Sequence, residues 1–132
     1  MKKHLYTKNS PAAIGPYSQA VLVDNLVFLS GQIPLNNKGK IVEGTVEQQA
    51  QQIFTNIEAI LVEAGGTLND LVKLTVFLTS LDDFEVINKI MMLRLTRPYP
   101  ARSCVEVSAL PKGSSVEVEA IARISLHTKL HT

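Results

Sequence analysis

Residues 45–66, TVEQQAQQIFTNIEAILVEAGG, carry the pattern that decides the fold. Apolar side chains recur there in steps of three and four residues, at Val46, Ala50, Ile53, Ile57, Ile60 and Ala64. Because this spacing keeps them on one face of an α-helix, the segment is predicted to be a helix that buries that face. Thr45 with Gln48 is typical of a capping box, and Gly65-Gly66 is a stop signal.

The segment after this helix alternates between two faces, as a β-strand does. In residues 71–80, LVKLTVFLTS, one face is predicted to carry the apolar side chains of Val72, Leu74, Val76 and Leu78. The other face is predicted to carry Lys73, Thr75, Phe77 and Thr79. The strand is therefore expected to pack its first face against a helix.

Further elements lie on both sides of this helix and strand. Residues 18–33 are typical of a β-hairpin with Asp24-Asn25 as its turn. A second helix is expected to begin near Asp82 or Asp83, and the prolines at 98 and 100 prevent its continuation. Residues 102–108 and 115–126 are predicted to be strands, joined by residues 109–114.

This order of elements predicts a single α+β domain over residues 1–132, with one sheet and two helices against its apolar face. The other face of such a sheet must meet water or another chain. A length of 132 residues suits one domain, and 45% hydrophobic with 19% charged residues is an ordinary globular composition.

The charge and the cysteine content exclude several classes of protein. A net charge of +1 provides no general attraction for nucleic acid or for membranes. One cysteine cannot form an intrachain disulfide, and the start MKKHLYTKNS lacks the apolar stretch of a secretory signal. No apolar run approaches the ~18 residues of a membrane span. We expect a cytoplasmic protein.

Charged residues and the cysteine gather on the last two predicted strands. Arg102 and Cys104 share one face of the first, while Glu117 and Glu119 lie opposite the apolar face of the second. If these strands pair with each other, all four side chains lie on the side away from the helices. Cross-strand Arg–Glu pairs are also common on solvated sheet faces, and a lone cysteine is most often a small buried hydrophobe.

Metal and nucleotide sites are not expected. His4, His127 and His131 lie near the termini without ligand spacing, and one cysteine leaves a zinc site incomplete. No glycine-rich phosphate loop is present, so the sequence predicts no cofactor.

Three segments together resemble the reactive intermediate deaminase family of the RidA/YjgF type. They are AAIGPYSQA at residues 12–20, LSGQIPL at residues 29–35, and PARSCVEV…LPKG…VEVEAIA within residues 100–122. The resemblance implies a chorismate mutase-like fold and a homotrimer that buries the uncovered sheet face, with active sites in clefts between subunits. Members of this family hydrolyse enamines and imines, such as 2-aminoacrylate, to 2-keto acids and ammonia.

The resemblance also implies roles for particular residues. Arg102 would hold the substrate carboxylate with its two-pronged guanidinium, and Glu117 would orient water or relay protons. The remaining pocket positions implied by the family are Tyr17 (from the neighbouring chain), Ser30, Gly31 (through its backbone), Asn88 and Cys104. Cys104 is not expected to be a nucleophile, because the sequence places no histidine to activate it.

The chain departs from the family over residues 89–103, KIMMLRLTRPYPARS, which lack the aromatic residues common there. This departure predicts a rebuilt helix end and an altered substrate range. Two other functions stay open. One is a non-catalytic trimer that binds 2-keto or amino acids. The other is action on RNA as a translation inhibitor, for which Arg94, Arg97 and Arg102 around Tyr99 would supply the basic residues.

Overall fold

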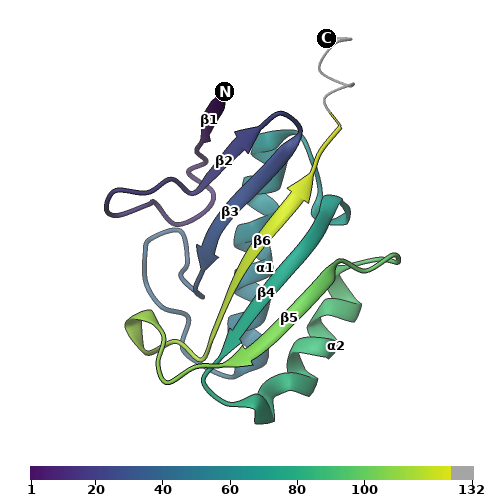
Figure 1. Ribbon diagram of the computed structural model, residues 1–132. Helices are drawn as coiled ribbons and strands as arrows, with labels where there is room; N and C mark the ends of the chain where they lie inside the picture. The colour runs from purple at the N-terminus through teal and green to yellow at the C-terminus, as the bar shows by residue number, and fades with distance from the viewer. Residues whose placement is uncertain (126–132) are drawn as a thin grey trace.

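A six-stranded sheet forms the centre of the computed structural model, which describes residues 1–125 (Figure 1). His127 and His131 lie outside the described residues. The sheet order is β1-β2-β3-β6-β4-β5, with β4 and β5 parallel and every other neighbouring pair antiparallel. The strands are β1 (Lys2–Leu5), β2 (Ala20–Val23), β3 (Leu26–Gln32), β4 (Leu71–Leu78), β5 (Ala101–Glu106) and β6 (Val116–Arg123).

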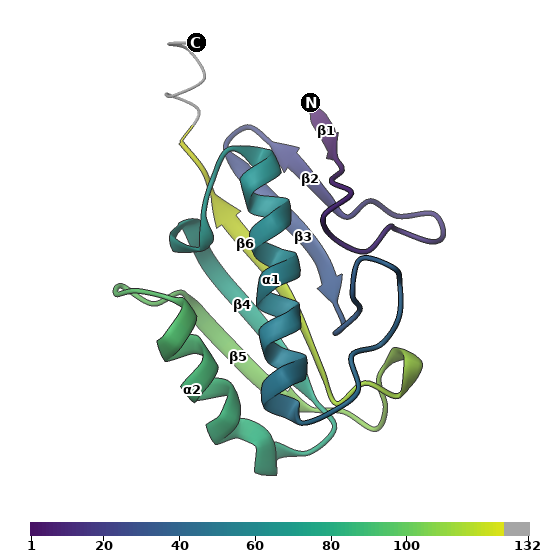
Figure 2. The same cartoon turned by 180° about the vertical axis from the view of Figure 1, so that it is seen from behind.

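Both helices, α1 (Val46–Ala64) and α2 (Phe84–Arg94), cover the same face of this sheet, as Figure 2 shows from behind. The single mixed sheet with two helices on one face confirms the predicted fold class. The predicted hairpin is also confirmed, since β2 and β3 pair across a turn in which Asp24 adopts a φ of 55°. No helix among the described residues is long and apolar enough to cross a membrane.

The first helix has the ends that its sequence predicts. The Thr45 side chain accepts a hydrogen bond from the Gln48 backbone, and the Gln48 side chain accepts one from the Thr45 backbone N–H. Gly65 ends the helix in the left-handed conformation, with a φ of 91°. The predicted apolar stripe lies against the sheet, where Ile53 and Ile57 are fully buried.

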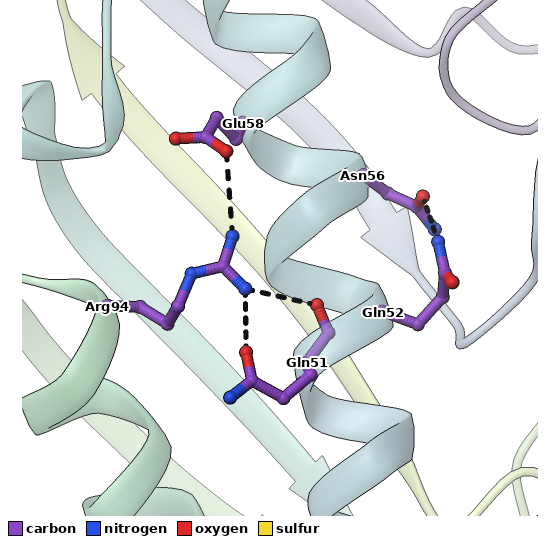
Figure 3. A network of polar contacts seen from close by, with 5 residues as sticks. All are labelled: Gln51, Gln52, Asn56, Glu58 and Arg94. Atoms are coloured by element: carbon purple, nitrogen blue, oxygen red, sulfur yellow. Dashed lines mark hydrogen bonds and ion pairs between the residues drawn. The ribbon is translucent and has the colours of Figure 1, made fainter.

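The second helix is joined to the first by polar contacts around Arg94 (Figure 3). Its guanidinium donates hydrogen bonds to the side chain of Gln51 at 2.7 Å and to the backbone carbonyl of Gln51 at 3.3 Å, and it lies 3.6 Å from Glu58. Elsewhere on α1, Gln52 donates to Asn56, and Asn56 donates to the carbonyl of Leu35. These last contacts attach the loop after β3 to the helix.

One position on β4 differs from the predicted alternation. The pairing with β6 shifts between Leu71 and Lys73, so Val72 is the additional residue of a β-bulge. Leu71 is therefore buried, and the prediction that Val72 joins the buried face is wrong, because this residue is 44% exposed. From Leu74 to Leu78 the predicted alternation is confirmed.

The pairing of the last two strands also differs from the prediction. β5 runs parallel to β4, because α2 returns the chain to the same end of the sheet in a crossover connection. β6 pairs with the other side of β4, so β4 separates the two strands whose direct pairing was the condition for a shared face. The short loop between β5 and β6 made direct pairing plausible. However, β5 lies at the edge of the sheet, where the crossover through α2 brings it beside β4.

Candidate active site

Strand β5 directs Arg102 toward helix α2. Arg102 lies opposite Leu74 in the register, and Leu74 is buried beneath the helices, so both side chains are on the helix-covered face. The guanidinium donates a hydrogen bond to Oδ1 of Asn88 and lies 4.8 Å from the centre of the Phe84 ring. A further contact, 3.4 Å long, joins it to the sulfur of Met91. Three residues of α2 therefore orient one arginine.

The charge of Arg102 is not neutralised by a carboxylate. Two ion pairs are found among residues 1–125, Lys89–Glu47 and Arg94–Glu58, and neither involves Arg102. Its partners are an amide oxygen, a thioether and an aromatic face. A half-buried guanidinium with such partners is prepared to bind an anion from outside the chain.

Cys104 lies two residues along the same face of β5, packed against the core. Burial raises the pKa of its thiol, and the nearby positive charge of Arg102 opposes this effect only in part. The thiol is therefore protonated near neutral pH, as expected for a pocket wall rather than for a nucleophile.

A separate cavity of about 710 Å³ opens at the far end of the sheet, among loops. Its walls are mostly apolar side chains and backbone from the segments 11–19, 30–39 and 111–112, together with Glu117 of β6. Tyr17, Ser30, Gly31 and Glu117 all line it, so four of the predicted site residues are brought together.

Glu117 lies across the backbone of β3 inside this cavity. A Cβ atom at Gly31 would be 2.7 Å from Oε2 of Glu117, so glycine is required for the carboxylate to occupy this position. Burial raises the pKa of Glu117, and the negative charge of Glu119 two residues along the strand adds to the effect. A carboxyl group with a raised pKa is suited to accepting and returning a proton.

Hydrogen bonds hold the cavity wall that carries Tyr17. The Ser30 hydroxyl donates to the carbonyl of Ser18 at 2.6 Å, and the Ser30 backbone N–H donates to the carbonyl of Gln19 at 2.9 Å. The buried side chain of Gln19 accepts from the Thr7 N–H at 2.8 Å and donates to the carbonyl of Pro11 at 2.8 Å. Its amide nitrogen also lies within hydrogen-bonding distance of the carbonyls of Thr7 and Ser10.

The predicted site residues thus form two separate groups in one chain. Glu117 and Glu119 lie opposite Phe77 and Thr75 on the uncovered face of the sheet, whereas Arg102 and Cys104 lie on the helix-covered face. The prediction that all four share the uncovered face is therefore wrong, because it assumed that β5 and β6 pair directly. No residue of β5 or α2 lines the cavity around Glu117.

Some residues of the cavity were not singled out from the sequence. Gln19 lies two residues after Tyr17 in the motif AAIGPYSQA, but its buried role depends on contacts with residues 7–11 that leave no periodic pattern in the sequence. Lys38 and Lys112 also line the cavity, and isolated lysines in loops carry no such pattern either. Among residues 1–125, no three His, Cys, Asp or Glu side chains are placed to hold a metal ion.

Known proteins match this chain over nearly its whole length. The family model described as Endoribonuclease L-PSP matches residues 7–124. An Escherichia coli protein named 2-iminobutanoate/2-iminopropanoate deaminase is 46% identical over 125 residues, which cover 92% of this chain and 98% of that protein. The chain belongs to the reactive intermediate deaminase family. The resemblance read from three sequence segments is thereby confirmed.

Solved structures of this family share the fold. A protein of the conserved Rid family from Yersinia pestis matches with a TM-score of 0.91 at 45% identity, over 94% of this chain and 100% of that one. The Escherichia coli protein TdcF, solved with bound serine, matches with a TM-score of 0.84 at 43% identity, over 93% and 99% of the two chains. The arrangement of sheet and helices is therefore that of the Rid family.

Proposed function

We propose that the chain hydrolyses 2-enamine and 2-imine acids to 2-keto acids and ammonia, in an active site shared by two copies of the chain. The observation that carries this proposal is the guanidinium of Arg102, which is half-buried, oriented by Asn88 and Phe84, and without a carboxylate partner among residues 1–125. Its planar fork suits a substrate carboxylate. The serine bound to Escherichia coli TdcF is a small molecule with such a group.

The position of the two groups supports a shared site. Arg102 and Glu117 lie on opposite faces of one sheet, so one chain alone does not bring both to one substrate. The uncovered face also exposes apolar side chains, with Phe28 39% and Val105 43% exposed. Burying this face against two further copies in a homotrimer would remove these side chains from water and place Arg102 beside a neighbour's Glu117.

Each group has its own role in the proposed reaction. Arg102 and Asn88 hold the substrate carboxylate, with Cys104 as part of the wall, while Tyr17 and Ser30 of the neighbour enclose the imine. Water adds to the carbon of the protonated imine, the C=N π pair moves to nitrogen, and the Glu117 carboxylate accepts the proton that the water loses. Glu117 then gives this proton to the amino nitrogen of the carbinolamine. The C–N bond breaks with its electron pair on nitrogen, the hydroxyl proton passes to Glu117 as the C=O bond forms, and ammonia and a 2-keto acid leave.

Two alternatives make different demands on these residues. A protein that only binds 2-keto or amino acids would need Arg102 but would not need Glu117 to move a proton. Action on RNA would need a continuous basic surface. Of the arginines around Tyr99, Arg94 binds Gln51 and Arg102 binds Asn88, while Arg97 lies 5.3 Å over the Tyr99 ring, so two of the three guanidinium groups are engaged by amides within the chain.

Turnover of 2-aminoacrylate, generated in situ by a serine or threonine dehydratase, tests the proposal. We expect 2-ketoacid release to be accelerated by the wild type. We expect Arg102→Ala to lose about a hundredfold or more in kcat/KM, because a charge-assisted bidentate contact is removed. Glu117→Gln should lose turnover while it retains 2-ketoacid binding. Full turnover by Glu117→Gln, or no acceleration by the wild type, would support a binding protein instead.

Mixed assemblies test whether the site is shared. Arg102→Ala and Glu117→Gln subunits, unfolded together and refolded, would form some sites with Arg102 from one chain and Glu117 from its neighbour. Random mixing restores about a quarter of the sites, since each half must come from the correct subunit. The same variants refolded separately and then combined are the control. No recovery in co-refolded trimers would place both residues of each site in a single chain.

A further inference from the structure

The cavity around Glu117 has two lysines in its wall, Lys38 and Lys112. Neither ammonium group forms a hydrogen bond or ion pair with another of residues 1–125. Glu117 is the only carboxylate side chain that lines this cavity within the described chain. The cavity therefore has a surplus of positive charge, which attracts anions.

Lys112 occupies a backbone conformation that lysine rarely adopts. Its φ of 56° and ψ of 25° lie in the left-handed region, and Gly113 follows with a φ of 68°. Two consecutive residues of this kind form a type I′ turn, for which Asn-Gly is the preferred pair. A lysine at the first position is strained, and the turn would be more stable with asparagine there.

The other left-handed residue of this kind has a side chain that suits its turn. Asp24, with a φ of 55°, lies in the tight turn between β2 and β3, where aspartate is favoured, and it does not line the cavity. Asp24 and Lys112 are the only non-glycine residues with positive φ in the described chain. The unfavourable residue is the one at the cavity, which is where retained backbone strain most often has a function.

We propose that Lys112 is a specificity-determining residue that draws carboxylate-bearing molecules into the cavity of Glu117. The inference rests on the proposed function, since the enamine form of a 2-imino acid and the 2-keto acid product each carry a negative carboxylate. Lys112 raises the local concentration of such anions and offsets the repulsion from an ionised Glu117. Arg102 then fixes the carboxylate, so the two cations act at different stages of binding.

Replacement of Lys112 separates this role from a structural one. Lys112→Asn removes the charge and provides the preferred turn residue, so we expect Tm to rise by about 3 °C. We expect its kcat/KM to fall about threefold at low ionic strength, and the difference to disappear in high salt. Lys112→Arg should keep both the wild-type activity and its salt dependence. Asp24→Asn, the matched change in the other turn, should leave turnover unchanged.

Binding of pyruvate and of its neutral amide, pyruvamide, gives a readout that does not need turnover. We expect Lys112→Asn to weaken pyruvate at low salt about threefold and to leave pyruvamide unaffected. Equal affinities of the wild type and Lys112→Asn for pyruvate at low salt would overturn the inference, whether or not the chain is an enzyme. The wild type could also lack deaminase turnover while Lys112→Asn still weakens pyruvate binding at low salt. That result would overturn the proposed function and leave the inference about Lys112 standing.

Discussion

The two groups of site residues are held in place by different forces. Arg102 and Asn88 come from strand β5 and helix α2, whose backbone positions depend on the apolar core between helices and sheet. Tyr17 and Lys112 come from loops, where buried amide side chains replace a hydrophobic core. The half of the proposed site on β5 and α2 is therefore positioned by the packing of helices on the sheet, while the other half depends on a few polar contacts.

Three buried amide side chains form most of the polar contacts that hold these loops in place. Gln19 holds the segment from Thr7 to Pro11, and Asn56 holds the loop at Leu35. Gln49 donates to the carbonyl of Val42 and accepts from the N–H of Ser115, so it joins the loop before α1 to the start of β6. A buried donor or acceptor that loses its partner costs about 1–3 kcal/mol, so single substitutions should loosen the cavity without unfolding the sheet.

The largest effect is expected for Gln19→Leu, which keeps the approximate shape of the side chain and removes its polar atoms. Four backbone groups of residues 7–11 lose their partner, so we expect the free energy of unfolding to fall by about 3 kcal/mol. Hydrogen exchange should accelerate in residues 7–18 far more than in β5 and α2. Turnover should also fall, because the loop that carries Tyr17 becomes less ordered.

Gln51→Leu is the matched control in the other region. It removes one side-chain contact of Arg94, which keeps its bond to the Gln51 carbonyl and its proximity to Glu58 (Figure 3). We expect a loss of about 1 kcal/mol or less and no local change in exchange near Tyr17. Equal losses of stability from Gln19→Leu and Gln51→Leu would remove the distinction between the two regions.

A smaller effect, on activity rather than on stability, is expected for Asn88→Ala. The change removes the amide oxygen that orients the Arg102 guanidinium, and we expect kcat/KM to fall about tenfold, mainly through KM. Asn88→Asp should cost more activity, because a carboxylate there would pair with Arg102 and compete with the substrate. Both variants should keep the wild-type Tm within a few degrees.

Lys89→Ala, the next residue of α2, is the control for this prediction. Lys89 forms an exposed ion pair with Glu47 at 2.8 Å and is not among the contacts of Arg102, so its loss should change neither KM nor Tm appreciably. An unchanged KM in Asn88→Ala would show that Arg102 is held in place without Asn88, by Phe84 and Met91 alone.

Elements packed on the core and loops held by polar contacts also differ in how well the sequence predicted them. Periodicity predicted α1, the hairpin and most of β4, because apolar spacing specifies which face of an element is buried. It could not specify which strand lies beside which, so the insertion of β4 between β5 and β6 was missed. The role of Gln19 was missed for another reason: long-range polar contacts to a loop leave no periodic pattern.

The smallest expected effect is on the pH dependence of kcat/KM, through the half of the site that contains Glu117. The pKa of Glu117 is raised by burial first and by the charge of Glu119 second, so Glu119→Gln should lower that pKa only in part. If ionised Glu117 accepts the proton of the attacking water, the acid limb of the kcat/KM profile should move to slightly lower pH in Glu119→Gln. Arg102 forms no ion pair with a carboxylate of residues 1–125, and its binding of the substrate carboxylate should be unaffected by the change.

The free energy of unfolding should also depend on the titration of Glu117. With its pKa raised on folding, Glu117 binds more protons in the native than in the unfolded chain between the two pKa values. The contribution of Glu117 to the free energy of unfolding is therefore largest below its pKa in the unfolded chain. This contribution is lost as the pH rises through its pKa in the folded chain. Tm measured across this range should decline less steeply in Glu119→Gln than in the wild type, and Glu117→Gln should abolish this part of the decline. An acid limb and a Tm profile that are both unmoved by Glu119→Gln would show that burial alone sets the proton affinity of Glu117.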